Sequence, residues 1–177
     1  TKHNFTTNIY LTMSQTDLFG IELPQKPSGG LTIIQNGEYI FHPNFFSKTD
    51  SDNFLKELRE NIKWKQESMN MYGKKIDFPR LTSWYGDNDK PYSFSGITLQ
   101  PHAWSPEILS IKQRIEPLSK TLFNSVLLNF YRNGNDSISW HTDAEKELGK
   151  NPIIASVNFG ATRNFQLRHT KTKEKLE

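Results

Sequence analysis

The stretch SVLLNFYRNGNDSISWHTD, residues 125–143, decides the fold that this sequence predicts. Two runs of strand-forming residues flank a turn that contains Asn133-Gly134, an order typical of a β-hairpin. Alternate side chains of a strand point to the same face, so His141 and Asp143 should project together from the second strand. The stretch therefore predicts two neighbouring strands that carry polar side chains at one end of a sheet.

These polar side chains suit a metal site and an acid-binding site. His141 and Asp143 provide two of the three ligands in the facial triad that binds non-haem Fe(II). Such a triad needs a second His and leaves room for a keto-acid cosubstrate and dioxygen. Asn129 and Tyr131 follow the same alternation on the preceding strand, and an amide and a phenol can hydrogen-bond the oxygens of an acid. The strand register, which decides whether both pairs share a face, stays open, and His-x-Asp alone is more typical of a surface pair.

Further short strands are expected on both sides of this stretch. Two β-prone runs around Asn36-Gly37 predict a hairpin within residues 31–43. Residues 71–100 are rich in aromatic and turn residues and predict short strands and loops. Downstream, PIIASVNFGATRNFQLRH predicts two strands that break at Gly160-Ala161.

Two helices are expected to pack outside the sheet. The first covers about residues 51–63, with cap candidates from Thr49 to Asp52. The second covers about residues 105–122, with Ser105 as N-cap, and its apolar residues are Ile108, Ile111, Ile115, Leu118 and Leu122. Pro117 should kink or split this second helix. Helices followed by a run of strands predict an all-β core with flanking helices, an α+β fold.

The composition limits the class of protein. A chain of 177 residues with 34% hydrophobic residues predicts one modest core, to which 12 Phe, 6 Tyr and 4 Trp contribute large rings. The absence of cysteine excludes disulfides and thiolate metal sites. No apolar run suits a leader peptide or a membrane span, so we expect no membrane association and a cytoplasmic monomer, nuclear in a eukaryote. The net charge of +3 fits a polyanionic partner without requiring one.

A long segment of the chain resembles a known family. The stretch LLNFYRNGNDSISWHTDAEKELGKNPIIASVNFGATRNFQLRH, residues 127–169, resembles the AlkB family of iron- and 2-oxoglutarate-dependent nucleic-acid dioxygenases. Upstream, PRLTSWYGD and PYSFSGITLQPHAW are similar to substrate-side segments of that family's duplex-DNA repair branch. The similarity covers roughly residues 40–177. It implies a double-stranded β-helix, or jelly roll, in an AlkB-like domain at residues 31–177, preceded by an N-terminal arm or linker at residues 1–30.

The resemblance also implies roles for individual residues. It makes His141 and Asp143 iron ligands and Asn129 and Tyr131 contacts of 2-oxoglutarate. On the nucleic-acid side it implies a duplex-entering finger and a pocket for the flipped base, and the matching residues are Tyr72, Gly73 and Lys74 in the finger, Tyr92, Ser93 and Phe94 in the pocket, Glu145 at an acidic position that contacts the damaged base, Arg80 in the matched Pro-Arg segment, and Arg168 at a DNA-facing position. Rings at these places replace part of the stacking that a flipped base loses.

Simpler interpretations remain open for several of these residues. Tyr92 and Phe94 also suit a core, and Tyr72 also suits an ordinary exposed turn. Glu145 also suits a charged helical face, and Arg163 also suits an anchor for the turn at Gly160. Lys171 and Lys173 suit phosphate contacts by charge alone.

Part of the family's pattern has no match in this sequence. The family's third iron ligand is a second His, followed by a pair of Arg that bind the far carboxylate of 2-oxoglutarate. We expect these residues beyond residue 177 and therefore expect the domain to be incomplete at its C-terminus. His169 aligns with a strand end ahead of the missing part and is not expected to bind the metal.

The reaction that the resemblance implies is oxidative demethylation of N-alkylated bases in DNA, such as 1-methyladenine and 3-methylcytosine. It uses Fe(II), 2-oxoglutarate and dioxygen, and it releases formaldehyde and succinate. Two alternatives stay open: a related oxygenase that acts on RNA or on another substrate, and a non-catalytic nucleic-acid-binding module if the third ligand is truly absent.

Overall fold

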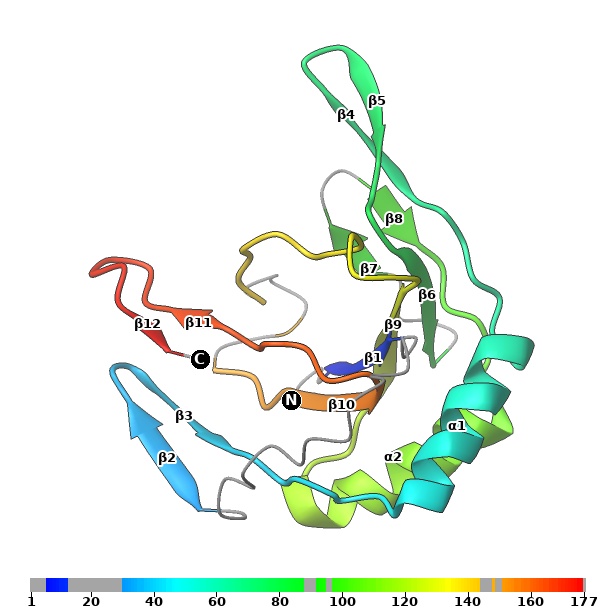
Figure 1. The fold of residues 1–177 in the computed structure, drawn as a ribbon, viewed down its shortest axis with the longest axis vertical. Coiled ribbons are helices and arrows are strands. Elements are labelled where there is room, and N and C mark those ends of the chain that lie inside the picture. The colour runs from blue at the N-terminus through cyan, green and yellow to red at the C-terminus, as the bar shows by residue number, and fades with distance from the viewer. Residues whose placement is uncertain are drawn as a thin grey trace, which may run out of the picture.

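The computed structural model describes residues 6–12, 30–87, 92–94, 97–143, 148 and 151–176. Its centre is a four-stranded sheet in the order β10-β1-β9-β6, formed by β1 (Thr6–Thr12), β6 (Leu81–Gly86), β9 (Ser125–Tyr131) and β10 (Ala155–Gly160). β1 runs parallel to both β9 and β10, whereas β6 runs antiparallel to β9. β9 and β10 therefore point the same way with one strand between them (Figure 1).

Two helices cover one face of this sheet, α1 (Lys48–Asn61) and α2 (Pro106–Ser119) (Figure 1). Alternation along β9 sends Val126, Leu128 and Phe130 into the core against the helices. The other members of this core are Phe46, Leu58, Ile62, Tyr85, Ile108, Ile111, Ile115, Phe123, Val157 and Phe159. The opposite face of β9 carries the alternate residues and is the face that concerns function.

The local signals for α2 were largely correct. Ser105 caps it, since its Oγ accepts a hydrogen bond from the N–H of Ile108 at 3.4 Å. The helix is not split at Pro117, which lies in its last turn, and it ends at Ser119, three residues before the predicted end. Leu118 is exposed although it lies within the helix, and Leu122 is exposed and lies outside it.

The helix α1 begins before its predicted start. Ser47 is its N-cap and accepts from the N–H of Asp50 at 3.0 Å, so the expected cap candidates lie inside the first turn. No helix in the described part of the chain is long and apolar enough to cross a membrane.

Four two-stranded hairpins surround the central sheet (Figure 1). They are β2 (Leu31–Ile34) with β3 (Gly37–Ile40), β4 (Ser68–Met71) with β5 (Lys74–Asp77), β7 (Tyr92–Phe94) with β8 (Ile97–Leu99), and β11 (Leu167–Arg168) with β12 (Lys175–Leu176). The first confirms the hairpin predicted at Asn36-Gly37, where Asn36 adopts a positive φ of 63°. The next two confirm short strands in residues 71–100.

The second strand predicted from the deciding stretch is absent, because residues 137–143 form no strand. The dipeptide Asn133-Gly134 does not make a hairpin turn, since neither residue has the positive φ that such a turn requires. The side chain of Asp136 instead accepts the backbone N–H of Arg132 at 2.9 Å. The N–H of Ser137 donates to the carbonyl of Pro79 at 2.8 Å, which directs the chain away from β9.

The N-terminal prediction also needs a correction for seven residues. Thr6–Thr12, expected in an arm or linker, form β1 between β9 and β10. Their sequence TTNIYLT is rich in β-branched and aromatic residues, which favour a strand even where no regular hydrophobic period is present. The described residues thus form a mixed α+β fold with short sheets, and the complete jelly roll and the domain boundary at residue 30 stay predictions.

Candidate active site

The predicted metal ligands lie together although they are not on a strand. His141 Nε2 is 3.5 Å from Asp143 Oδ1, and both side chains are partly exposed. The carbonyl of Ser139 lies 2.8 Å from His141 Nδ1. A carbonyl only accepts, so Nδ1 carries the proton and Nε2 keeps its lone pair for a metal. Two ligand atoms of one octahedral ion lie on the order of 3 Å apart, so this pair fits a divalent metal.

Asn129, a predicted cosubstrate contact, is fully buried on the functional face of β9. Its Oδ1 accepts a hydrogen bond from Arg80 Nε at 2.8 Å. Among the described residues, its Nδ2 is buried without a hydrogen-bond partner, as is Oγ1 of Thr82, which lies directly opposite on β6. Buried polar atoms are normally paired, so two orphaned atoms on one face of adjacent strands mark a place for a polar ligand. A carboxylate, which only accepts, fits both donors.

Tyr131 lies two residues further along the same face and is buried. The guanidinium carbon of Arg163 is 4.7 Å from the centroid of its ring. Burial raises the pKa of Tyr131 to about 12, although the positive charges of Arg80 and Arg163 act in the opposite direction. The phenol therefore stays protonated at neutral pH and can donate to a carboxylate.

The turn between β9 and the metal ligands is held by an ion pair. Asp136 is buried and accepts from Arg132 through Nε at 2.7 Å, Nη2 at 3.0 Å and the backbone N–H. The guanidinium of Arg132 holds the pKa of the Asp136 carboxyl below its usual range. This pair fixes the chain as it leaves Tyr131 toward His141.

Cations stack on the indole next to the metal ligands. Trp140 is 44% exposed, with the guanidinium carbon of Arg168 at 4.3 Å and Nζ of Lys175 at 5.9 Å from its ring centroid. The cations come from the β11–β12 hairpin and therefore lie beside His141 in space, 27 or more positions later in sequence. This arrangement gives the surface beside the site a positive charge.

The predicted finger is the tip of the β4–β5 hairpin, which projects away from the central sheet (Figure 1). Met71 pairs with Lys74, so the connection consists of Tyr72 and Gly73 alone. Both have positive φ, 50° and 75°, as a type I′ turn requires. Tyr72 is 98% exposed although the left-handed conformation costs a non-glycine residue about 1 kcal/mol.

Other predicted site residues are less completely described. Tyr92, Ser93 and Phe94 form β7, paired with β8, and Glu145 lies outside the described residues. Arg80 is largely buried, with its side chain toward β9.

A third metal ligand is not found. Within the described residues, no group of three or more His, Asp or Glu side chains could hold a metal ion. His169 instead contacts Asn36 Nδ2 through Nε2 at 3.1 Å and accepts the N–H of Thr172 through Nδ1. The first contact fastens the β11–β12 hairpin to the β2–β3 turn, and the second lies within the β11–β12 hairpin.

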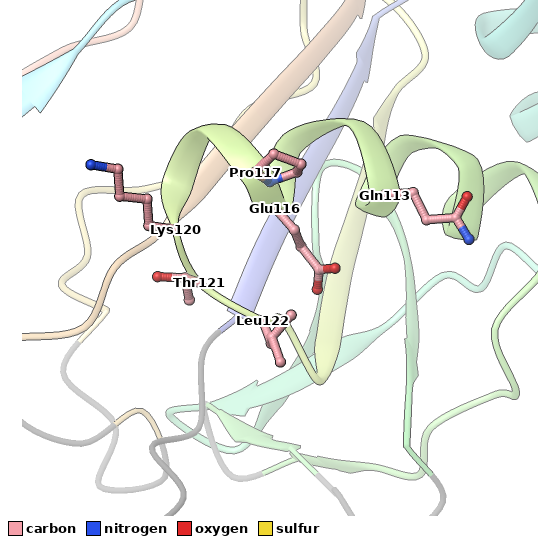
Figure 2. Close-up of a pocket in the computed structure, with 6 residues that line it drawn as sticks. All are labelled: Gln113, Glu116, Pro117, Lys120, Thr121 and Leu122. Atoms are coloured by element: carbon pink, nitrogen blue, oxygen red, sulfur yellow. The ribbon is translucent and has the colours of Figure 1, made fainter.

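A hollow at the C-terminal end of α2 is separate from this site (Figure 2). It is lined by Gln113, Glu116, Pro117, Lys120, Thr121 and Leu122. Its main acidic group is already used, because Glu116 Oε1 accepts the N–H of Phe123 at 2.8 Å and lies 3.7 Å from Lys112 Nζ. None of the predicted site residues lies there.

Sequence reasoning missed several residues that shape the site. Arg132 and Asp136 have the i,i+4 spacing of an ion pair, which could have been noticed. Thr82 could have been found only from the register of β6 against β9. The contacts of Arg163 with the β9 turn join distant parts of the chain and have no local signal.

Comparisons with known proteins show which family the chain belongs to. The family model for the 2OG-Fe(II) oxygenase superfamily matches residues 38–177. The alpha-ketoglutarate-dependent dioxygenase alkB homolog 3 of Homo sapiens is 43% identical over 128 residues, which cover 72% of this chain and 44% of that protein. The DNA oxidative demethylase ALKBH2 of Bos taurus is 36% identical over 154 residues, 84% of this chain and 55% of that protein.

A plant relative gives the longest of these alignments. The DNA oxidative demethylase ALKBH2 of Arabidopsis thaliana is 31% identical over 172 residues, 92% of this chain and 54% of that protein. The chain spans about half the length of the curated relatives it matches.

Proposed function

The chain belongs to the 2OG-Fe(II) oxygenase superfamily, and on that premise we propose that it acts in the oxidative demethylation of N-alkylated bases in DNA, such as 1-methyladenine and 3-methylcytosine. The products of this reaction are formaldehyde and succinate. The observation that carries the proposal is the pairing of His141 Nε2 with Asp143 Oδ1 at 3.5 Å. The buried Asn129 amide supports it, because its Nδ2 donor has no partner among the described residues. Relatives described as DNA oxidative demethylases support the choice of substrate.

His141 and Asp143 would hold Fe(II), which together with 2-oxoglutarate supplies the oxidation of the N-methyl group by dioxygen. The carbonyl of Ser139 fixes the imidazole tautomer, so that Nε2 is available to the metal. The Asn129 amide and the Tyr131 phenol would donate to a carboxylate of 2-oxoglutarate. Arg80 orients that amide, because its Nε donates to Oδ1 and leaves Nδ2 for the ligand.

The nucleic-acid side of the proposal rests on charge and exposure. Tyr72, with Gly73 and Lys74, would enter the duplex where the damaged base has left the stack. The hairpin's four-residue strands extend about 13 Å, which is enough for its tip to reach a groove. Arg80 is proposed to act near the base pocket, together with Tyr92, Ser93, Phe94 and Glu145. Arg168 would contact a phosphate beside the metal site.

The test uses the intact protein with Fe(II), 2-oxoglutarate and oligonucleotides that contain 1-methyladenine or 3-methylcytosine. Restored bases, formaldehyde and succinate in equal amounts are expected, with loss of all three in His141→Ala. Activity on methylated RNA but not on DNA would favour the RNA oxygenase. Tight binding of the oligonucleotide without any product, unchanged in His141→Ala, would favour the non-catalytic module.

The finger is tested by Tyr72→Ala. Since Tyr72 is 98% exposed, the free energy of unfolding should change by less than about 0.5 kcal/mol. Repair of duplex DNA should fall at least about 5-fold, because stacking of one ring on a base is worth about 1–3 kcal/mol, while repair of single strands should persist. Tyr39→Ala, on the exposed β2–β3 hairpin, is the matched control and should change neither activity. Equal losses on both substrates would contradict a role in duplex entry.

A further inference from the structure

Arg163 follows the end of β10, where Gly160 turns the chain with a φ of 92°. Its guanidinium makes three contacts. The first is with the ring of Tyr131, at 4.7 Å from the centroid. In the others, Nη1 donates to the carbonyl of Asn133 at 3.4 Å and Nη2 donates to the carbonyl of Asp136.

All three contacts fall on one short segment, residues 131–136. That segment begins with a predicted cosubstrate contact and leads into the chain that carries the metal ligands. In the central sheet, β9 and β10 are separated by β1, so neither hydrogen-bonds the other directly. Arg163 therefore connects the loop after β10 to the end of β9, across the intervening strand β1. Its role is wider than anchoring the turn at Gly160.

The geometry of a guanidinium explains why this residue type suits the task. Its planar fork can stack on a ring with one face while its N–H groups donate in the plane. Stacking fixes the plane of the Tyr131 ring, and the two donated bonds fix the backbone that follows. A lysine at this position would keep the positive charge, but its ammonium group lacks the planar fork and could not make both directional hydrogen bonds.

We propose that Arg163 is a positioning residue for the acid cosubstrate, holding Tyr131 and the turn at residues 132–136 so that the phenol of Tyr131 and the amide of Asn129 face one carboxylate. This inference rests on the proposed function, because it needs 2-oxoglutarate as the ligand. It assigns to Arg163 no direct contact with the ligand. Arg163 also differs from Arg168, whose guanidinium stacks on the Trp140 ring beside the metal ligands. The guanidinium of Arg163 instead donates to two backbone carbonyls.

The test compares Arg163→Met, Arg163→Lys and wild type in the intact protein. Calorimetric titration with 2-oxoglutarate, with Zn²⁺ in place of iron so that no turnover occurs, measures the Kd. We expect Arg163→Met to raise the Kd about 10-fold, in the range seen when groups that orient ligand-binding residues are removed. Arg163→Lys should give a smaller increase. In turnover with iron, KM for 2-oxoglutarate should rise with little change in kcat.

Arg114→Met is the matched control. Its guanidinium carbon lies 4.4 Å from the Phe46 ring centroid and it donates to Asp50 at 3.0 Å, on the helical side of the sheet. It loses a similar set of contacts, but the Kd for 2-oxoglutarate should stay within twofold of wild type. A second readout is amide hydrogen exchange without ligand, which should accelerate at residues 132–137 in Arg163→Met and, to a smaller extent, in Arg163→Lys, but not in Arg114→Met.

The outcomes separate this inference from the proposed function. If wild type does not bind 2-oxoglutarate, the proposed function fails. If wild type binds and both Arg163 variants keep its Kd, or if Arg114→Met weakens binding equally, the positioning role is overturned. Should Arg163→Met fail to fold, Arg163→Lys decides: a raised Kd with faster exchange at residues 132–137 supports the role, and a wild-type Kd rejects it.

Discussion

Asn129 offers a substitution that should separate stability from ligand binding. An aspartate has nearly the shape of asparagine, and it can accept from Arg80 Nε as Oδ1 does now at 2.8 Å. It also removes the unpaired Nδ2 donor, a buried defect worth about 1–3 kcal/mol. Burying the new carboxylate costs several kcal/mol, which opposes these gains. Because the opposing contributions are similar in size, we expect Asn129→Asp to unfold within about 1 kcal/mol of wild type.

Asn129→Ala should behave differently. It removes the acceptor of a buried guanidinium and leaves a space at a residue that is fully buried. A loss of about 2–4 kcal/mol is expected in urea denaturation, consistent with breaking a buried hydrogen bond to a charged group. The identity of the acceptor atom is secure on chemical grounds, since a guanidinium only donates and must face Oδ1.

Asn129→Asp, which should hardly change stability, should strongly weaken the binding of 2-oxoglutarate. A carboxylate about 4 Å from a carboxylate of the ligand costs about 4 kcal/mol at an effective dielectric constant of 20, or about 1,000-fold in Kd. Calorimetry with the Zn²⁺-loaded protein measures this. Asn158→Asp is the control, because it adds the same charge at the same register position two strands away, at an exposed residue of β10. Either wild-type affinity in Asn129→Asp, or instability equal to that of Asn129→Ala, would refute the reasoning.

Two further predictions concern the segment that follows Asn129. Asp136→Ala should lower the free energy of unfolding by about 2–4 kcal/mol at pH 7, because three hydrogen bonds from Arg132 are lost. Since the pKa of Asp136 is lowered from 3.8, this contribution is present above pH 3.8 and disappears as pH falls through the lowered value, so urea midpoints of variant and wild type should converge in acid. Tyr131 has its pKa raised from 10.0 to about 12, so wild type should lose about 3 kcal/mol as pH rises from 10 to 12. Tyr131→Phe should lack that loss. If the free energy of unfolding falls equally in wild type and Tyr131→Phe between pH 9 and pH 11, the prediction is contradicted.

The dipeptide Asn-Gly occurs twice in the chain, and the two cases show what the sequence alone could predict. Asn36-Gly37 forms the predicted hairpin, whereas Asn133-Gly134 does not, although both lie between strand-prone runs. The difference is a side chain: Asp136 accepts the backbone N–H of Arg132 and thereby takes the place of a strand partner. Caps such as Ser105 were predictable because their partners lie three residues away. In the sequence, Arg132 and Asp136 were visible only as an i,i+4 pair. Whether Asp136 or a strand partner would bind the N–H of Arg132 could not be predicted from that spacing.

The sequence suggested the residue types of the candidate site but not the contacts that support them. His141 and Asp143 were expected to meet because they alternate along a strand, yet they meet in a segment with no strand, with the Ser139 carbonyl orienting the imidazole. Arg163 reaches the β9 turn from about 30 residues downstream, and no local pattern encodes such a contact. Short polar motifs therefore suggest candidate ligands, whereas the residues that would hold them in place depend on the order of strands in the sheet.

That order gives β9 a double role. Its odd-numbered functional residues, Asn129 and Tyr131, alternate with Leu128 and Phe130, which pack against the helices. A shift of one residue in the pairing of β9 with β6 would send the amide and the phenol into the apolar core, at a large cost in unpaired polar groups. The packing of α1 and α2 therefore enforces the register that places Asn129 opposite Thr82, and the precision of the proposed acid site derives from the hydrophobic core behind it.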